Sequence, residues 1–176
     1  MNLFKLIISF TLFGLLFSCD EKIQEKKSSL TIKELQDTLT IINKELMKSE
    51  DHIISKYVER KSEEFIKSET GLRYLVYHRG RGENFAKAGK YATISYKITL
   101  LNGELCYESK PGKNKEFLIE GDDIESGIHE GIKYMRVGDK AKLIIPSYMA
   151  HGLLGDMNKI PPRSPIVYDL ELLRLR

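Results

Sequence analysis

The chain has 176 residues, of which 41% are hydrophobic and 30% are charged, and this balance excludes global disorder. Its formal net charge of +3 comes from 28 basic and 25 acidic residues. The two signs are interleaved along the chain, so no nucleic-acid partner is expected. The length favours one domain with appendages.

Residues 1–18 have the form of a secretory signal peptide. Lys5 supplies a positive charge, and the mostly apolar segment 6–17 is too short for a comfortable membrane span. The segment ends in Leu-Phe-Ser-Cys, which resembles a lipobox, where bacterial signal peptidase cuts before a lipid-modified cysteine. Cys19 is therefore the expected lipidation site, and its acyl chains would attach the protein to a membrane. The alternatives are an ordinary signal peptide with a chance cysteine and an uncleaved anchor.

Cys19 and Cys106 are the two cysteines of the chain. If Cys19 carries lipid, no intramolecular disulfide can form. Cys106 is expected to be a small buried hydrophobic side chain rather than a nucleophile. Residues 19–29 are mostly polar and are expected to be a tether between the membrane and the folded part.

Residues 30–68 are expected to form a helical arm. Residues 31–34 have the Thr-x-x-Glu form of a capping box, which starts a helix. The apolar side chains that follow are spaced alternately by four and three residues and form one stripe: Leu35, Leu39, Ile42 and Leu46. Polar residues 49–51 interrupt this pattern, and a second helical stretch is expected to about Lys67. The arm packs either on the neighbouring domain or on a second copy in a homodimer.

Residues 70–176 are expected to form a globular domain with several strands. Alternating side chains predict a strand after Gly71, and a long strand over 91–101 precedes Asn102-Gly103, a strong hairpin signal, with the return strand at 104–108. Further strands are expected at 117–119, 140–145 and 166–175. Strands with one short helix predict an α+β fold in which the helix covers one sheet face.

The stretch 127–162 holds that helix and a long loop. Ile128, Ile132 and Met135 recur at i, i+4 and i+7 and so share one helical face. Gly138 is expected to end the helix in a left-handed conformation. Pro146 ends the following strand because proline cannot donate to a sheet ladder. The loop from there to Pro162 is long enough to favour a functional role.

These motifs together resemble the FKBP-type peptidyl-prolyl isomerases. The resemblance covers about residues 70–176 and, with the lipobox, is closest to the gliding-motility-associated lipoproteins of Bacteroidetes. It is carried by Tyr96 on the long strand, the hairpin at 102–103, Gly-Ile-His-Glu-Gly at 127–131, Met-Arg-Val-Gly-Asp-Lys at 135–140, Ile-Pro at 145–146, Ala-His-Gly at 150–152, Ile-Pro-Pro at 160–162 and Tyr-Asp-Leu-Glu-Leu-Leu at 168–173.

The resemblance implies a bent antiparallel sheet wrapped around a short helix, with an apolar pocket between them. It also implies an isomerase that acts on proline-containing polypeptides and needs no cofactor and no metal. Rotation about a peptide bond has a barrier of about 18–20 kcal/mol because the twisted amide loses its resonance. A dry pocket that binds the twisted amide more tightly than the planar one is sufficient for catalysis.

The resemblance also assigns the pocket residues. Those expected to act on the amide are Tyr96, Ile128, His151 and Tyr168, and those expected to contact the substrate are Ile124, Glu125, Ile160 and Phe117. The two tyrosines would be aromatic walls, Ile128 the floor beneath the proline ring, and Glu125 a backbone N–H donor. Plain core packing is the alternative for the tyrosines.

Several positions depart from the family pattern. Ile128 stands where an aromatic residue or leucine is common and would leave a roomier floor, and the Glu125 side chain stands where an apolar residue is usual. Cys106-Tyr107 replaces the usual aromatic and acidic pair, which is expected to remove an apolar wall and a carboxylate from the pocket. His151 stands where a tyrosine hydroxyl normally donates to the substrate, and a neutral imidazole can still donate one hydrogen bond.

Two functions follow from these observations. The first is a prolyl isomerase, lipid-anchored in a bacterial cell envelope, that assists the folding of exported or envelope proteins, gliding-motility components included. The outer membrane is favoured, with the domain facing the periplasm or the cell surface. The alternative is a catalytically weak peptide-binding chaperone or motility-complex module that uses the same pocket and the loop 149–154. An envelope protein without a ligand is the third possibility.

Overall fold

A computed structural model describes residues 31–121 and 124–176. The predicted signal peptide, the lipidation site Cys19 and the tether lie outside the described residues. The described residues belong to two units, with the boundary between Leu39 and Thr40. Among the described residues, no helix combines the length and the apolar character that a membrane span requires.

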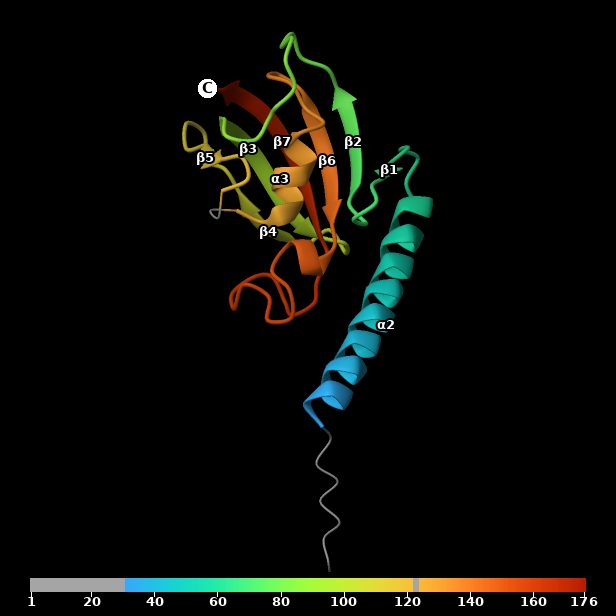
Figure 1. Ribbon diagram of the computed structural model, residues 1–176. Coiled ribbons are helices and arrows are strands. Elements are labelled where there is room, and N and C mark those ends of the chain that lie inside the picture. Colours follow the sequence, from blue (N-terminus) through green and yellow to red (C-terminus); the bar gives the residue numbers. More distant parts are fainter. Residues whose placement is uncertain (1–30, 122–123) are drawn as a thin grey trace, which may run out of the picture. The chain divides into compact units, whose positions relative to one another are not determined.

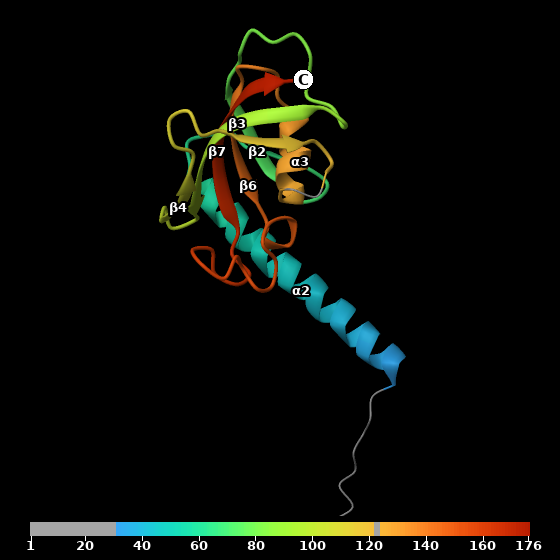
Figure 2. The ribbon, with the colours of Figure 1, turned by 90° about the vertical axis from the view of Figure 1, so that its left-hand side faces the viewer.

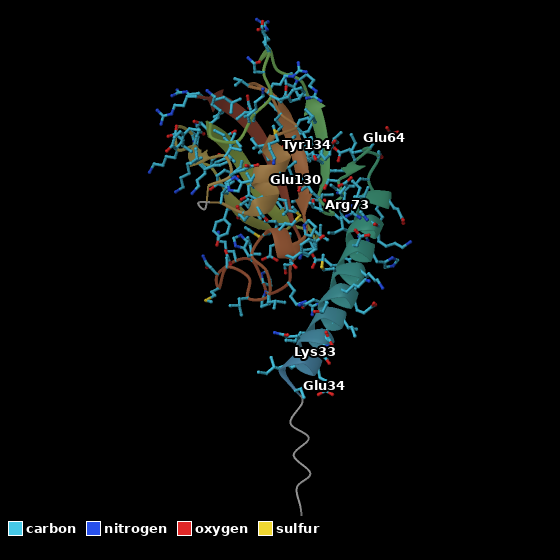
Figure 3. The ribbon with its side chains drawn as sticks, viewed as in Figure 1. Lys33, Glu34, Glu64, Arg73, Glu130 and Tyr134 are labelled. Carbon is cyan, nitrogen blue, oxygen red and sulfur yellow. The ribbon has the colours of Figure 1, made fainter. Side chains whose placement is uncertain are left out.

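The helix α2 (Ile32–Glu59) begins with the predicted capping box. The backbone N–H and the hydroxyl of Thr31 donate to the Glu34 carboxylate over 2.8 and 2.9 Å, and the Glu34 N–H donates to the Thr31 hydroxyl over 3.3 Å. Glu34 thus lies in the first turn of the helix (Figure 3). These reciprocal bonds satisfy donors that a helix start otherwise leaves free.

The arm differs from the expectation in two ways. The predicted break at residues 49–51 is wrong, because α2 is continuous through them. Asp51 forms ion pairs with Arg73 over 2.7 Å and with Lys67 over 2.9 Å, so its charge has partners outside the helix. The predicted second helical stretch to Lys67 is also wrong, since the chain after Glu59 turns and forms the short strand β1 (Ile66–Lys67).

The sheet is antiparallel throughout and confirms the predicted α+β fold. Its strands run in the order β1-β2-β6-β7-β3-β4, and β5 pairs with β3 (Figure 1). The strands are β2 (Arg73–His78), β3 (Tyr91–Leu100), β4 (Leu105–Glu108), β5 (Lys115–Leu118), β6 (Lys140–Ile145) and β7 (Ile166–Leu175). Register shifts interrupt the pairing of β3 with both β7 and β4, and such irregularities bend a sheet.

The predicted short helix, α3 (Ser126–Ile132), lies against one face of this sheet (Figure 2). Its apolar face, continued by Met135 after the helix ends, is fully buried. Two glycines allow the close approach of α3 to β6. A methyl group at Gly127 would lie 2.3 Å from Ile145 Cγ2, and one at Gly131 would lie 2.3 Å from Leu143 Cδ1. The helix can therefore pack directly on the strand.

The other face of the sheet is covered by the C-terminal half of α2. Ile144 and Val167 are cross-strand partners on β6 and β7 and form a buried cluster with Ile54 of α2. Since successive side chains of a strand point to opposite faces, their neighbours on both strands point toward α3 instead. Both faces of the central sheet are thus buried.

A tight turn leads into β6 at Asp139. The prediction that Gly138 ends the short helix is wrong, because α3 already ends at Ile132, but the expected left-handed turn is present. Gly138 has φ +87°, a left-handed conformation that favours glycine. Asp139 is fully buried and accepts hydrogen bonds from the N–H groups of Gly80 and Arg136 and from the Arg79 guanidinium, over 2.7, 3.0 and 2.9 Å. Burial opposes its charge, but these donors outweigh the burial and hold the pKa of Asp139 below its usual value.

Candidate active site

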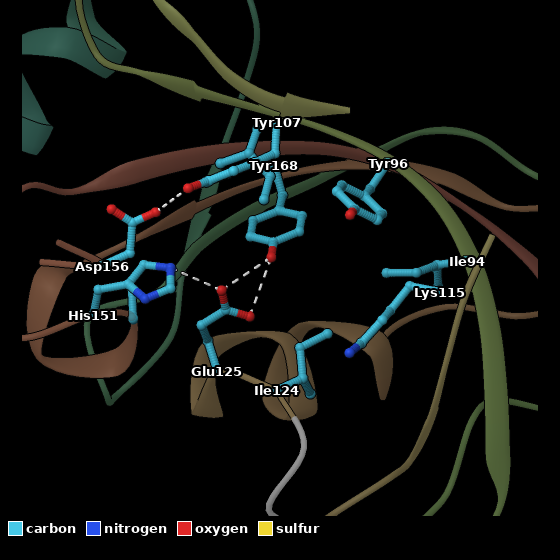
Figure 4. Close-up of a pocket in the computed structure, with 11 residues that line it drawn as sticks. Ile94, Tyr96, Tyr107, Lys115, Ile124, Glu125, His151, Asp156 and Tyr168 are labelled. Carbon is cyan, nitrogen blue, oxygen red and sulfur yellow. Dashed lines mark hydrogen bonds and ion pairs between the residues drawn. The ribbon is translucent and has the colours of Figure 1, made fainter. Parts of the chain in front are cut away.

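A cavity of about 520 Å³ opens between the sheet and the start of α3. Its apolar lining comes mainly from β3, and its polar groups come from β4, β5, β7, the residue before α3 and the loop after β6 (Figure 4). The lining residues are Ile94, Tyr96, Ile98, Tyr107, Lys115, Ile124, Glu125, Ala150, His151, Asp156 and Tyr168.

Five of the predicted site residues meet in this cavity: Tyr96, Ile124, Glu125, His151 and Tyr168. The sheet register accounts for the two tyrosines. Tyr168 of β7 is the cross-strand partner of Ile98 on β3, so Tyr96, two residues away, lies on the same face as Tyr168. Their ring centroids are 5.9 Å apart with planes tilted by 45°. The rings form two sides of an aromatic corner.

The Glu125 side chain points toward Tyr168 of β7 and toward His151 of the loop after β6 (Figure 4). Both carboxylate oxygens accept from the Tyr168 hydroxyl, over 3.2 and 3.1 Å. His151 Nε2 lies 3.0 Å from Glu125 Oε1. The side chains of Glu125 and His151 are 13% and 26% exposed. Sequence reasoning did not predict where this carboxylate points, and in the structure it joins Tyr168 to His151.

This contact also fixes the state of the Tyr168 hydroxyl. Burial raises the pKa of Tyr168, and the adjacent negative charge of Glu125 and the hydrogen bond to it raise the pKa further. The hydroxyl therefore stays protonated and keeps donating to Glu125. A tyrosine ring held at both ends offers a rigid wall to a ligand.

Tyr107 and Asp156 are cavity residues that sequence reasoning missed. The Tyr107 hydroxyl donates a short hydrogen bond to Asp156 Oδ2, while Oδ1 accepts from the N–H groups of Ile160 and Asn158 over 2.7 and 2.9 Å. Burial opposes the charge on Asp156, but these three donors prevail and lower its pKa to about 2. Tyr107 brings no carboxylate of its own to the pocket, and Asp156 supplies one from the loop after β6.

The signal for this pair was faint in the sequence. Asp156 follows Gly155 in a turn-forming run, where an aspartate is ordinarily read as part of the turn. Nothing local connects it with Tyr107, which is 49 residues away along the chain. Cys106, beside Tyr107, is 1% exposed, and burial raises the pKa of its thiol, as expected for a buried hydrophobic side chain.

Three predicted site residues lie in the core behind the cavity lining. Ile128, Ile160 and Phe117 are 0%, 2% and 1% exposed. The Phe117 ring packs edge-on against His129. Ile160 contributes its backbone, which donates to Asp156. The apolar surface that faces the cavity comes instead from Ile124 and from β3.

The site thus combines an aromatic corner and aliphatic surface with two carboxylates, an imidazole, the Lys115 ammonium and three tyrosine hydroxyls. Within residues 31–121 and 124–176, no group of three or more histidine, cysteine, aspartate or glutamate side chains is placed to hold a metal ion. The cavity is suited to a compact apolar ring flanked by polar amide groups. An antiparallel sheet curved around one short helix, with such a cavity between them, defines a class of small α+β ligand-binding domains.

Comparison with known proteins identifies the family within this class. Residues 82–173, about half of the chain, match the family described as FKBP-type peptidyl-prolyl cis-trans isomerase. The chain therefore belongs to the FKBP-type peptidyl-prolyl cis-trans isomerase family.

Its relatives include a larger protein and a smaller one. The isomerase FkpA of Escherichia coli (strain K12) is 37% identical over 110 residues, which are 62% of this chain and 39% of FkpA. The isomerase FKBP1A of Xenopus laevis is 33% identical over 107 residues, which are 60% of this chain and 98% of that protein. The chain spans about two fifths of the length of the FkpA proteins it matches.

Solved structures agree with this assignment. The crystal structure of FkpA from Escherichia coli superposes with a TM-score of 0.60 at 28% identity and covers 100% of this chain and 83% of that one. The crystal structure of AtFKBP13 gives a TM-score of 0.59 at 29% identity, over 64% of this chain and 99% of that one. The predicted fold is thereby confirmed.

Proposed function

We propose that this protein is a peptidyl-prolyl cis-trans isomerase whose active site is the cavity described above. The observation that supports the proposal most strongly is the aromatic corner of Tyr96 and Tyr168 beside aliphatic surface, in a chain of this family. A proline ring is compact and apolar, and it fits such a corner. The polar groups at the rim are placed for the amides on either side of the ring.

The reaction requires no covalent step by the protein. The barrier of about 18–20 kcal/mol arises from lost amide resonance, so no bond has to be made or broken. In the twisted state the prolyl nitrogen becomes pyramidal and the preceding carbonyl is no longer conjugated with it. A pocket that excludes water and fits this geometry better than the planar one lowers the barrier.

Three groups have proposed roles in this step. Tyr96 and Tyr168 hold the proline ring, and Tyr168 is kept rigid by its bonds to Glu125. The Glu125 backbone N–H is proposed to donate to a substrate carbonyl. His151 replaces a hydroxyl donor at the rim and is oriented by Glu125. Ile128, Ile160 and Phe117 are proposed to act from behind, by supporting the lining.

Exchange NMR on an Xaa-Pro peptide tests this proposal. We expect the full chain in mild detergent to accelerate cis-trans exchange, and the Tyr168→Ala variant to lose about 100-fold in kcat/KM because one wall of the pocket is gone. Tyr91→Ala is the matched control, since Tyr91 is an exposed tyrosine of β3 outside the cavity. A folded wild-type protein that leaves exchange unchanged would contradict the proposal.

Lipid attachment at Cys19 is the second part of the proposal. It is supported by the apolar segment 6–17 and the lipobox-like residues before Cys19. The domain would then be anchored to a bacterial membrane, of which the outer membrane is favoured, and would act on exported or envelope proteins. Labelling with a fatty-acid analogue in a bacterial host tests this, because Cys19→Ala should abolish both the label and membrane fractionation.

A role in gliding motility is the finest part of the proposal. It depends on the resemblance to the gliding-motility-associated lipoproteins of Bacteroidetes and on the predicted lipid anchor. Deletion of the gene in a gliding bacterium should reduce colony spreading, with restoration by the wild-type gene. Restoration by a Tyr168→Ala gene would show that motility does not need the isomerase.

A peptide-binding module with weak catalysis is the alternative function. The specific observation that favours it is the exposure of Leu153, Leu154 and Met157, which are 65%, 67% and 84% exposed. They lie on the loop that also supplies His151 and Asp156 to the cavity. If these side chains bind peptides, proline-free apolar peptides should also bind. A Leu153→Ser and Leu154→Ser double variant should then weaken this binding without slowing the isomerisation of a short peptide.

A homodimer through residues 30–68 is also proposed. Of the stripe that the sequence predicted, Leu35, Leu39 and Ile42 are 47%, 49% and 47% exposed, whereas Leu46 is half-buried and lines a small cavity with Tyr148 and Leu153. A second copy would bury this stripe. Sedimentation should show a dimer for the wild type and a monomer for Leu39→Glu.

A further inference from the structure

A buried carboxylate joins α2 to the loop that forms one wall of the cavity. Glu50 is 7% exposed, although it belongs to a helix whose other charged side chains are mostly exposed. Its Oε1 accepts a short hydrogen bond from the Ser147 backbone N–H, and its Oε2 accepts from the Ser147 hydroxyl over 2.6 Å. Both carboxylate oxygens are therefore bound to one residue, 97 positions further along the chain.

Docking of the helix does not by itself require this charge. Ile54, one turn after Glu50, is fully buried against Ile144 and Val167 and secures the helix by apolar contact. Burying a carboxylate costs free energy unless strong hydrogen bonds compensate. An apolar side chain at position 50 would bury itself without that cost. The contact between Glu50 and Ser147 therefore serves to fix the position of Ser147, and not only to hold α2 on the sheet.

Ser147 controls the backbone on both sides of His151. It opens the short helix η1 (Ser147–Met149), directly after Pro146. Its carbonyl oxygen accepts from the N–H of Ala150 over 3.0 Å and from the N–H of Gly152 over 2.7 Å. These two residues flank His151, so the position of Ser147 sets the position of the imidazole.

A second contact holds the same segment from the side of α3. The Ser126 hydroxyl donates to the Met149 carbonyl over 3.2 Å, and Ser126 follows Glu125 in the chain. The segment that carries His151 is thus fixed between α2 and the start of α3. His151 Nε2 lies 3.0 Å from Glu125 Oε1, in the segment that these two contacts hold.

We propose that Glu50 is a positioning residue of the isomerase site: through Ser147 it places His151 against Glu125 at the rim of the prolyl pocket. The inference builds on the proposed isomerase function and adds α2 to the machinery of the site. Loss of Glu50 should release the loop, draw His151 away from Glu125 and leave Tyr168 with a less ordered partner.

Kinetics of the full chain in mild detergent give the first test. We expect Glu50→Ala to lower kcat/KM for an Xaa-Pro peptide about tenfold, since small displacements of a site group are costly. Glu50→Gln should lose less, because its amide oxygen can still accept from Ser147. Glu45→Ala is the matched control, as Glu45 is an exposed glutamate of α2 that pairs with Lys48 of the same helix, and it should leave kcat/KM unchanged.

A double-mutant cycle separates positioning from general damage. In a His151→Ala background, Glu50→Ala should change kcat/KM less than about twofold, because the group it positions is already absent. An equal loss in both backgrounds would overturn the proposal and leave Glu50 a purely structural residue. Should Glu50→Ala fail to fold, Ser147→Ala removes only the hydroxyl contact and should repeat the pattern with a smaller loss.

A measurement without turnover distinguishes failure of this inference from failure of the isomerase proposal. The His151 ring resonances report the contact with Glu125, and Glu125→Ala, which leaves no acceptor there, provides the reference for its loss. Glu50→Ala should move these resonances toward the reference even if the wild-type protein catalyses nothing. Unchanged ring resonances in folded Glu50→Ala would contradict the inference, whatever the activity.

Discussion

Two carboxylates at different places in the domain are buried in different ways. Asp139, at the turn before β6, is held mainly by backbone N–H groups of two separate loops. Glu125, at the cavity, is held by the side chains of Tyr168 and His151. The first arrangement ties pieces of main chain together, whereas the second aligns side chains that face a ligand. The same chemical group therefore supports the fold in one region and the site in the other.

The surroundings of Asp139 agree with this distinction. Gly80 approaches Gly138 so closely that a methyl group on Gly80 would lie 2.3 Å from the Gly138 backbone. The loops at 80–82 and 137–139 can adopt this arrangement only as a pair. The cavity, in contrast, leaves room for a ligand beside Glu125.

Removing Asp139 should have the largest effect on stability. Asp139→Ala leaves the N–H groups of Gly80 and Arg136 without their acceptor, and we expect the free energy of unfolding in urea to fall by about 2–4 kcal/mol. The folded fraction should keep its kcat/KM, because the cavity is untouched. A loss below about 1 kcal/mol would show that the turn does not depend on this carboxylate.

Acid should weaken the Asp139 contact in a defined direction. The pKa of Asp139 is lower in the folded protein than in the unfolded chain, so its contribution is fully present above about pH 4 and is lost as the pH falls through the folded pKa. Asp156, with a folded pKa of about 2, should add a second loss toward pH 2. Urea unfolding between pH 6 and pH 2 should show a shallower pH dependence for Asp139→Asn than for wild type.

The Tyr168 hydroxyl should matter more for activity than for stability. Tyr168→Phe keeps the ring but leaves Glu125 with one partner fewer, and we expect kcat/KM to fall about fivefold and unfolding free energy to fall by about 1 kcal/mol. Exchange NMR and urea unfolding measure the two quantities on one preparation. A large fall in the free energy of unfolding with unchanged kcat/KM would contradict this expectation. It would mean that Glu125, like Asp139, mainly stabilises the fold.

The smallest effect is expected at the Tyr107 hydroxyl. Tyr107→Phe removes a donor to Asp156, so the pKa of Asp156 should rise from about 2 toward its ordinary value. The carboxyl carbon shift of Asp156 follows this titration directly, and kcat/KM should change by about twofold or less. An unchanged titration would mean that the backbone donors alone hold the carboxylate ionised.

Sequence patterns predicted the fold well wherever the cause is local. The capping box at Thr31, the turn at Gly138 and the apolar face of α3 each depend on a few neighbouring residues, and the structure contains all three. The break expected at residues 49–51 is absent, because the polar side chains there have partners far away in the sequence. Glu50 is accommodated by Ser147 and Asp51 by Arg73, partners that helical periodicity cannot show.

The site was predictable to a similar extent. The family motifs predicted Tyr96, Glu125, His151 and Tyr168 as pocket residues, and all four line one cavity in the structure. The direction of the Glu125 side chain could not be predicted, because an apolar residue is usual there and supplies no rule for a carboxylate. Asp156 could not be predicted either, since its partner Tyr107 lies on a different strand.

The most direct test of the account is a single NMR sample in which wild-type protein is titrated with an Xaa-Pro peptide. We expect faster cis-trans exchange together with shift changes centred on Tyr96, Glu125, His151 and Tyr168, and we expect Tyr168→Ala to lose both. Shift changes centred on Leu153 and Leu154 without faster exchange would contradict it and favour the peptide-binding module.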